Sequence, residues 1–169
     1  SKGEIVELVR NSDAFIRGAG RTISCSHPMR GEKGVLGRPR NCGYCFPCLI
    51  RRASLTGIDI EDQYLDDYVD AYKISAEFIR NQKYANPDEG RTKDLKAVLF
   101  ALHDYLKNGS VEYYENKMIA LGGLSLNEIR QFVRVYIKGM EEIKIMIEAQ
   151  AAKNGLDLLE YVNSGIKNE

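Results

Sequence analysis

The four cysteines of this chain lie in one short stretch, as Cys25, Cys42, Cys45 and Cys48. Two cysteines separated by two residues can bind one metal ion, because the turn between them directs both sulfurs to the same side. Thiolates prefer zinc or iron–sulfur clusters to hard cations, and four of them close a tetrahedral shell. The spacing therefore predicts a structural metal site, with zinc as the expected cofactor, contributing about 10 kcal/mol or more to folding.

Other chemistries use similar cysteine patterns. Cys45-Phe46-Pro47-Cys48 has the form of a redox dithiol, but that motif normally follows a strand, and here a loop rich in glycine and arginine precedes it. An iron–sulfur cubane can use C-x2-C-x2-C with a remote fourth cysteine, so spacing alone leaves it open. Two disulfides packed this closely would suit a small secreted protein. Four free thiols are the interpretation that the clustering favours least.

Charge is distributed unevenly along the chain, although the formal net charge is zero. Residues 1–52 hold ten Lys or Arg against four Asp or Glu, a net +6, and residues 53–169 hold fourteen against twenty, a net −6. Zero net charge argues against a protein that coats DNA regardless of sequence. The basic third is suited either to an anionic ligand or to the acidic remainder of the same fold.

Targeting signals are not apparent in the sequence. The opening Ser1-Lys2-Gly3-Glu4 is not the basic and apolar start of a secretory signal. No run approaches the roughly 18 apolar residues of a membrane span. We therefore expect a cytoplasmic protein without a membrane partner.

Helical periodicity dominates the chain outside the cysteine region. Ser1 with Glu4 and Ser125 with Glu128 have the spacing of capping boxes at helix starts. The predicted helices cover residues 1–11, 49–55, 71–83, 92–108, 110–121, 126–153 and 156–162, and residues 17–43 are predicted as loop. The expected fold is mainly α, with a four-cysteine zinc loop and short helices followed by a helical bundle. Its expected divisions are residues 1–56, a connecting segment 57–90 and a helical extension 91–169.

The longest predicted helix, 126–153, carries an apolar stripe. Its members recur at threes and fours and should face the leucines of the 92–108 helix, Leu95 to Leu106; they are Ile129, Phe132, Val133, Tyr136, Met140, Ile143 and Ile147. Gly139 costs about 1 kcal/mol relative to Ala within a helix, so it suggests a close helix approach or a slight bend. We expect this region to have an apolar core of its own and no catalytic group.

The cysteine region resembles the zinc loop of the 7-cyano-7-deazaguanine synthase (QueC) family. That family's pattern is S-C, a spacer, C-G-x-C-x-x-C-x-x-R, then a small and an apolar residue. The matching residues are Ser24-Cys25, then Cys42-Gly43-Tyr44-Cys45-Phe46-Pro47-Cys48, then Arg51 and Ala53-Ser54-Leu55. The opening Ser1-Lys2-Gly3-Glu4-Ile5-Val6 is similar to the (S/T)-K-x-E-I-V stretch upstream of that loop. The resemblance covers about a third of the chain.

One branch of that family is a closer match. S-C-S-H-P together with C-G-Y-C-x-P-C-L-I-R-R-A-S-L is similar to QatC, the QueC-like component of the Qat anti-phage system, which carries a helical extension. Residues 123–139 are similar to part of that extension. The spacer after Cys25 is longer than in the housekeeping enzyme, and S-H-P replaces its polar residues, so the resemblance leaves the substrate open.

The resemblance implies an ATP-dependent chemistry for the parent protein. The family belongs to the PP-loop ATP pyrophosphatases, α/β enzymes that adenylate a deazaguanine-type carboxylate and then form an amide or nitrile. Its ATP site is an S-G-G-x-D-S loop, which this chain lacks; Gly122-Gly123-Leu124-Ser125 is only an ordinary helix break. We therefore expect the chain to be the C-terminal part of such an enzyme and to be inactive alone.

The functional residues follow partly from this resemblance. Arg51 matches the family's arginine, so it is a candidate substrate-binding residue, although it would equally suit a position where it offsets the thiolate charge. His27 is the second candidate, and no catalytic residue is assigned. The expected partners are ATP and a deazaguanine-type small molecule, bound through the other half, and defence-operon proteins. The alternative is a zinc-loop module that binds nucleic acid or protein, for which basic residues lie beside Tyr44 and Phe46.

Overall fold

The computed structural model describes residues 1–26, 41–58, 60, 93–154 and 162–163. Within these ranges the fold is mainly α, as predicted, and contains no β-strand. The elements are α1 (Lys2–Val9), α2 (Asp13–Gly18), the 3-10 helix η1 (Ala19–Arg21), α3 (Phe46–Thr56), α5 (Lys93–Asn108), α6 (Val111–Leu121) and α7 (Leu126–Asn154). The predicted helix 71–83 and most of the predicted helix 156–162 lie outside the described residues.

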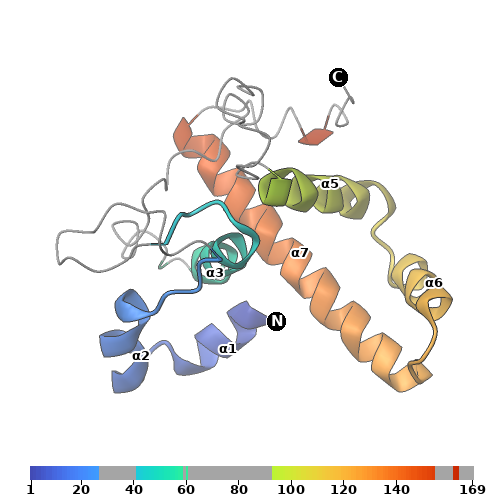
Figure 1. The fold of residues 1–169 in the computed structure, drawn as a ribbon, viewed down its shortest axis with the longest axis horizontal. Helices are drawn as coiled ribbons and strands as arrows, with labels where there is room; N and C mark the ends of the chain where they lie inside the picture. Colours follow the sequence, from blue (N-terminus) through green and yellow to red (C-terminus); the bar gives the residue numbers. More distant parts are fainter. Residues whose placement is uncertain (27–40, 59, 61–92, 155–161, 164–169) are drawn as a thin grey trace.

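Helix α7 is the axis on which the other long helices pack (Figure 1). Its N-terminal half contacts α6, and its C-terminal half contacts α3 and α5. The main buried core combines these elements: Leu49 and Ala53 from α3, Leu95, Val98, Leu99 and Leu102 from α5, Met140, Ile143, Met146 and Ile147 from α7, and Val162. The helix that follows the cysteines is therefore part of the same core as the C-terminal helices.

That shared core corrects one expectation about the helical region. Among the described residues, only the cluster of Tyr114, Ile129 and Val133, between α6 and α7, belongs to that region alone. The larger core includes α3, because α7 presents apolar side chains to two neighbours at once. The sequence stripe shows this only indirectly, since a stripe reveals which residues are buried but not which helix covers them.

The apolar stripe of α7 differs from the predicted one at two members, Phe132 and Tyr136, which are exposed. Phe132 is 55% exposed, whereas its neighbour Val133 is 2% exposed. Adjacent helical positions lie about 100° apart, so a narrow contact with α6 can cover only one of the two. At the other end the stripe is wider than predicted, because Met146, Gln150 and Ala151 are also buried.

The glycine that brings two helices together is Gly3 rather than Gly139. A Cβ at Gly139 would meet no atom within 4 Å in the described part of the chain, so no close approach occurs there. A Cβ at Gly3 would collide with the Glu142 carboxylate. The Gly3 N–H donates to Glu142 Oε2 at 3.2 Å, and the Ser1 hydroxyl also donates to this carboxylate. Helix α1 is thus joined to α7 through its first turn.

Most helix boundaries follow the predicted signals. Both capping boxes, Ser1 with Glu4 and Ser125 with Glu128, are present. Gly122 and Gly123 end α6 with φ values of 71° and 82°. The expected loop after residue 17 was wrong at its start, because η1 occupies Ala19–Arg21 and α2 extends to Gly18. The signal for α2 is Ser12, whose hydroxyl accepts the Phe15 N–H at 3.2 Å as an N-cap.

A single carboxylate joins α5 to α6. Asp104 accepts hydrogen bonds from Tyr113 at 2.9 Å, Tyr114 at 3.2 Å, Lys117 at 3.0 Å and Asn108 at 3.1 Å. Burial opposes its ionisation, but the bonds from Lys117, Tyr113 and Asn108 prevail and lower the pKa of Asp104. An ionised side chain therefore helps to fix the short α5–α6 connection.

Candidate metal centre

All four predicted ligands converge on one point. The Sγ atoms of Cys25, Cys42, Cys45 and Cys48 lie within 4.8 Å of one another, and all four side chains are buried. The Cys42–Cys48 and Cys25–Cys45 sulfur pairs are each 3.9 Å apart, and all four thiols are free. Four sulfurs at about 2.3 Å from one zinc ion would lie about 3.8 Å apart. The sulfur–sulfur distances therefore match those expected around one tetrahedral ion.

The local backbone explains why three of these sulfurs meet. Gly43, with φ of 89°, turns the chain between Cys42 and Cys45, a conformation that disfavours side chains. Cys45 is the N-cap of α3, and Cys48 follows in its first turn. Pro47 fits this turn because its missing N–H would have no partner there in any case. The partial positive charge at the N-terminus of α3 favours thiolates at both positions.

Backbone N–H groups point at the sulfurs. The Cys42 N–H donates to Cys25 Sγ at 3.4 Å, and the Cys45 N–H donates to Cys42 Sγ at 3.3 Å. Donors of this kind stabilise sulfur as thiolate, the form in which cysteine binds a metal. The backbone is therefore arranged for charged sulfur.

The thiols also shift one another's pKa values in opposite directions. The bond from the Cys42 thiol lowers the pKa of Cys45 far below its usual range, and the same bond raises the pKa of Cys42 to about 12. Neighbouring thiols and burial raise the pKa of Cys48 as well. The hydrogen bond between the Cys42 and Cys45 thiols therefore favours the thiolate form of Cys45 and opposes that of Cys42. A divalent cation would supply the charge that allows all four to deprotonate, with release of protons.

Asn41 holds the segment that carries Cys25, and Asn41 was not among the predicted site residues. Its Oδ1 accepts the Ser24 N–H at 3.0 Å, and its Nδ2 donates to the Thr22 carbonyl at 3.3 Å. These bonds hold the segment that ends in Cys25 against the segment that begins with Cys42. Asn41 is 2% exposed, and its position directly before Cys42 was the only available signal.

Arg51, a predicted substrate-binding residue, is a buried side chain of α3 that contacts the segment before Cys25. Its guanidinium donates to the Thr22 carbonyl at 2.9 Å, to the Thr22 hydroxyl at 2.6 Å and to the Ala19 carbonyl at 2.6 Å. It therefore ties α3 to the approach to Cys25, and substrate contact by Arg51 stays a prediction. His27, the other predicted substrate-binding residue, lies outside the described residues.

The N-terminus of α3 has an unexpected partner on α5. The Cys45 side chain makes no capping hydrogen bond in α3, and its sulfur lies in the cysteine cluster. The Phe46 N–H donates instead to Asp94 Oδ2 at 2.8 Å. An acid in the first turn of a helix normally serves that helix, so the sequence around Asp94 gave no sign that it caps α3. The cysteine region and the C-terminal helices are joined directly at this bond.

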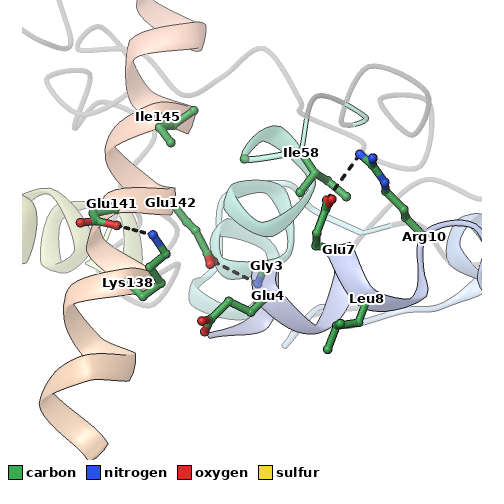
Figure 2. Close-up of a pocket in the computed structure, with 11 residues that line it drawn as sticks. Gly3, Glu4, Glu7, Leu8, Arg10, Ile58, Lys138, Glu141, Glu142 and Ile145 are labelled. Atoms are coloured by element: carbon green, nitrogen blue, oxygen red, sulfur yellow. Dashed lines mark hydrogen bonds and ion pairs between the residues drawn. The ribbon is translucent and has the colours of Figure 1, made fainter. Parts of the chain in front are cut away.

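A hollow lies between α1 and α7 (Figure 2). It measures about 720 Å³, and its carboxylates are Glu4, Glu7, Glu141 and Glu142. Each has a partner within the chain: Arg134 bonds Glu4, Arg10 lies 3.4 Å from Glu7, Lys138 bonds Glu141, and Gly3 bonds Glu142. The hollow contains none of the cysteines. Glu4 and Glu142 join α1 to α7, whereas Glu7 and Glu141 pair with residues three positions away in the sequence.

The chemistry of the cysteine cluster is that of a closed shell. Four protein sulfurs fill a tetrahedral ion's coordination sites and leave none for water or substrate. A four-iron cubane would place a separate iron on each sulfur and hold the sulfurs farther apart than around one ion. The geometry therefore suits one ion in a structural role. No helix in the described ranges combines the length and apolar character needed to cross a bilayer.

Comparison of the chain with protein-family models, with curated proteins and with solved structures gives no match in any of the three.

Proposed function

We propose that this chain binds one zinc ion through Cys25, Cys42, Cys45 and Cys48 and is the zinc-bearing C-terminal region of a QueC-like, ATP-dependent enzyme in phage defence. The observation that carries the proposal is the convergence of four buried sulfurs within 4.8 Å, in a loop whose sequence follows the family pattern from Ser24 to Arg51. Zinc is preferred because it takes four thiolates in tetrahedral geometry and adds no redox chemistry to a buried site.

The role of the ion in this proposal is mechanical. The ligands come from two segments, 22–25 and 41–48, that contain few buried aliphatic side chains of their own. The ion would join them and hold α3 at a fixed angle to the loop. The loop would then form one wall of a substrate site, with the chemistry carried out by ATP-binding residues that this chain does not contain.

The reaction of the parent enzyme would be activation of a deazaguanine-type carboxylate as an adenylate, followed by amide or nitrile formation. The chain has no S-G-G-x-D-S string, so the proposal requires that the ATP site come from another part of the protein. In this scheme the helical extension, α5 to α7, offers a docking surface for defence-operon partner proteins. Its exposed apolar side chains include Leu121, Leu126 and Phe132.

The alternative is a nucleic-acid-binding zinc module, and two residues that could have contacted the nucleic acid are buried. Tyr44 is 8% exposed, and the guanidinium of Arg51 is engaged by Ala19 and Thr22. Buried groups of this kind are not available for phosphate contact or base stacking. Phe46, which is half exposed, keeps the alternative open.

Two measurements test the proposed function. Elemental analysis of the purified chain should find one zinc per chain, and iron or no metal would contradict the zinc assignment. The coding sequence upstream of Ser1 should contain an S-G-G-x-D-S loop. The protein that includes it should release pyrophosphate from ATP with a deazaguanine carboxylate, whereas the 169-residue chain alone should not. Steady pyrophosphate release by this chain alone would contradict the proposal.

A further inference from the structure

Arg52 is the largest fully buried side chain in the described part of the molecule, with 0% exposure. Burying a guanidinium is costly unless it is hydrogen-bonded and suits the local charge. One turn earlier on α3 stands Cys48, on the same face of the helix, since residues four apart are neighbours. Arg52 is therefore directed toward the cysteine cluster, whereas Leu49 and Ala53 pack into the apolar core.

The guanidinium holds a specific backbone group in the cysteine turn. Arg52 Nη1 donates to the Gly43 carbonyl at 3.2 Å. Gly43 lies between the ligands Cys42 and Cys45, and its φ is 89°. Because glycine has no Cβ, sterics alone do little to fix the orientation of the peptide that follows it. A hydrogen bond to this carbonyl therefore fixes the orientation of the Gly43–Tyr44 peptide.

The other end of the same peptide faces a ligand. The C=O and N–H of a trans peptide point in opposite directions, so a carbonyl held by Arg52 turns the Tyr44 N–H away from it. That N–H lies toward the Cys42 sulfur, with which it makes a hydrogen bond. The next N–H, of Cys45, donates to the same sulfur at 3.3 Å. Cys42 thus receives donors from a turn that Arg52 braces.

We propose that Arg52 is a positioning residue of the metal centre: it locks the Gly43–Tyr44 peptide with its N–H toward the Cys42 sulfur and places a buried positive charge beside the tetrathiolate. This inference rests on the proposed metal centre and extends it beyond the four ligands. A divalent ion with four thiolates carries a net charge of −2, so a buried guanidinium nearby lowers the cost of burying the centre. Arg51, by contrast, braces the Thr22 side of the loop.

The test compares Arg52→Met and Arg52→Lys with Leu49→Ala, each purified with its metal. Leu49 is equally buried on the same helix but faces the apolar core, so Leu49→Ala controls for loss of helix stability. Competition with a chromophoric chelator measures zinc affinity, and replacement by Co²⁺ gives the sulfur-to-cobalt charge-transfer band. We expect Arg52→Met to lower zinc affinity about 10- to 100-fold, as outer-shell substitutions typically do.

The spectrum separates positioning from general destabilisation. Without Arg52 the Tyr44 N–H is no longer held toward the Cys42 sulfur. Loss of that donor raises the energy of the sulfur lone pairs, so Arg52→Met should shift the charge-transfer band to lower energy. Arg52→Lys, which keeps the charge and one donor, should recover part of the affinity and serves as the test if Arg52→Met does not fold. Leu49→Ala should leave the band unchanged. Wild-type affinity and spectrum in both Arg52 variants would overturn the inference, and a wild-type chain that binds no metal would overturn the metal centre itself.

Discussion

The two ends of this molecule are held together by different chemistry. At the cysteine end the buried cluster consists of Cys25, Cys42, Cys45 and Cys48 with Tyr44, and it contains no aliphatic side chain. Between α6 and α7 the buried cluster is Tyr114, Ile129 and Val133, with apolar neighbours packed against it. Burial can therefore order the second end, whereas the first has four sulfurs positioned to hold a cation and few apolar contacts of its own. One domain can thus contain regions with separate requirements for folding.

The largest expected effect comes from removing a ligand. Cys45→Ser should abolish metal binding and the order of segments 22–26 and 41–45, since the free energy of metal binding, about 10 kcal/mol or more, is also folding free energy. Metal analysis and hydrogen exchange, followed by mass spectrometry, measure both changes. Exchange should also rise in α3, which begins at Phe46, and stay slow between α6 and α7.

A matched variant at the other end sharpens this result. Ile129→Ala should destabilise the α6–α7 contact and leave the metal content at that of the wild type. Retention of metal by Cys45→Ser, or loss of metal in Ile129→Ala, would show that the two ends do not differ as described.

Core substitutions should distinguish the shared core from the α6–α7 cluster. Leu99→Ala and Ile129→Ala should each lower the free energy of unfolding by about 2–5 kcal/mol, because both side chains are buried. Only Leu99 packs in the core that includes Leu49 and Ala53 of α3. Thermal unfolding with a parallel chelator assay should therefore show faster metal loss in Leu99→Ala alone. Equal rates in the two variants would contradict the role of α3 as the link.

The Asp104 network should make the α5–α6 junction pH-dependent. Folding lowers the pKa of Asp104. The stabilisation is therefore fully present above the pKa of the unfolded chain, about 3.9, and is lost as the pH falls through the pKa of the folded chain. Asp104→Asn should cost about 1–2 kcal/mol at pH 7, because charge-assisted hydrogen bonds are lost. Urea unfolding at pH 7 and pH 3 measures the difference. A cost that does not shrink at pH 3 would argue against an ionised Asp104.

The smallest effect is expected at Phe132, the most exposed member of the predicted stripe. Phe132→Gln should change the free energy of unfolding by less than about 0.5 kcal/mol, because the side chain is mostly exposed and Gln is a good helix former. Circular dichroism during thermal unfolding gives the comparison with Ile129→Ala. A loss as large as that of Ile129→Ala would show that Phe132 is covered.

Local patterns were sufficient for the parts of the structure that depend on neighbouring residues. The Cys42–Cys48 spacing places three ligands in one turn and one helix start, so the cysteine cluster was predictable. The α6 and α7 boundaries follow from Ser110, Ser125 and the Gly122-Gly123 pair, whose effects act within a few residues. The family relationship, by contrast, stays a prediction.

The helical class, most helix ends and the meeting of Cys42, Cys45 and Cys48 follow from the sequence, because each depends on residues within one or two turns. Tertiary packing was needed to show which helix covers each apolar face, that Asp94 caps α3, that Asn41 holds the Cys25 segment and that Arg52 braces the Gly43 peptide. These contacts join residues from 9 to 48 positions apart. No local propensity encodes such pairs, because they exist only after the packing of α3 against α5 and α7 has brought the chain segments together.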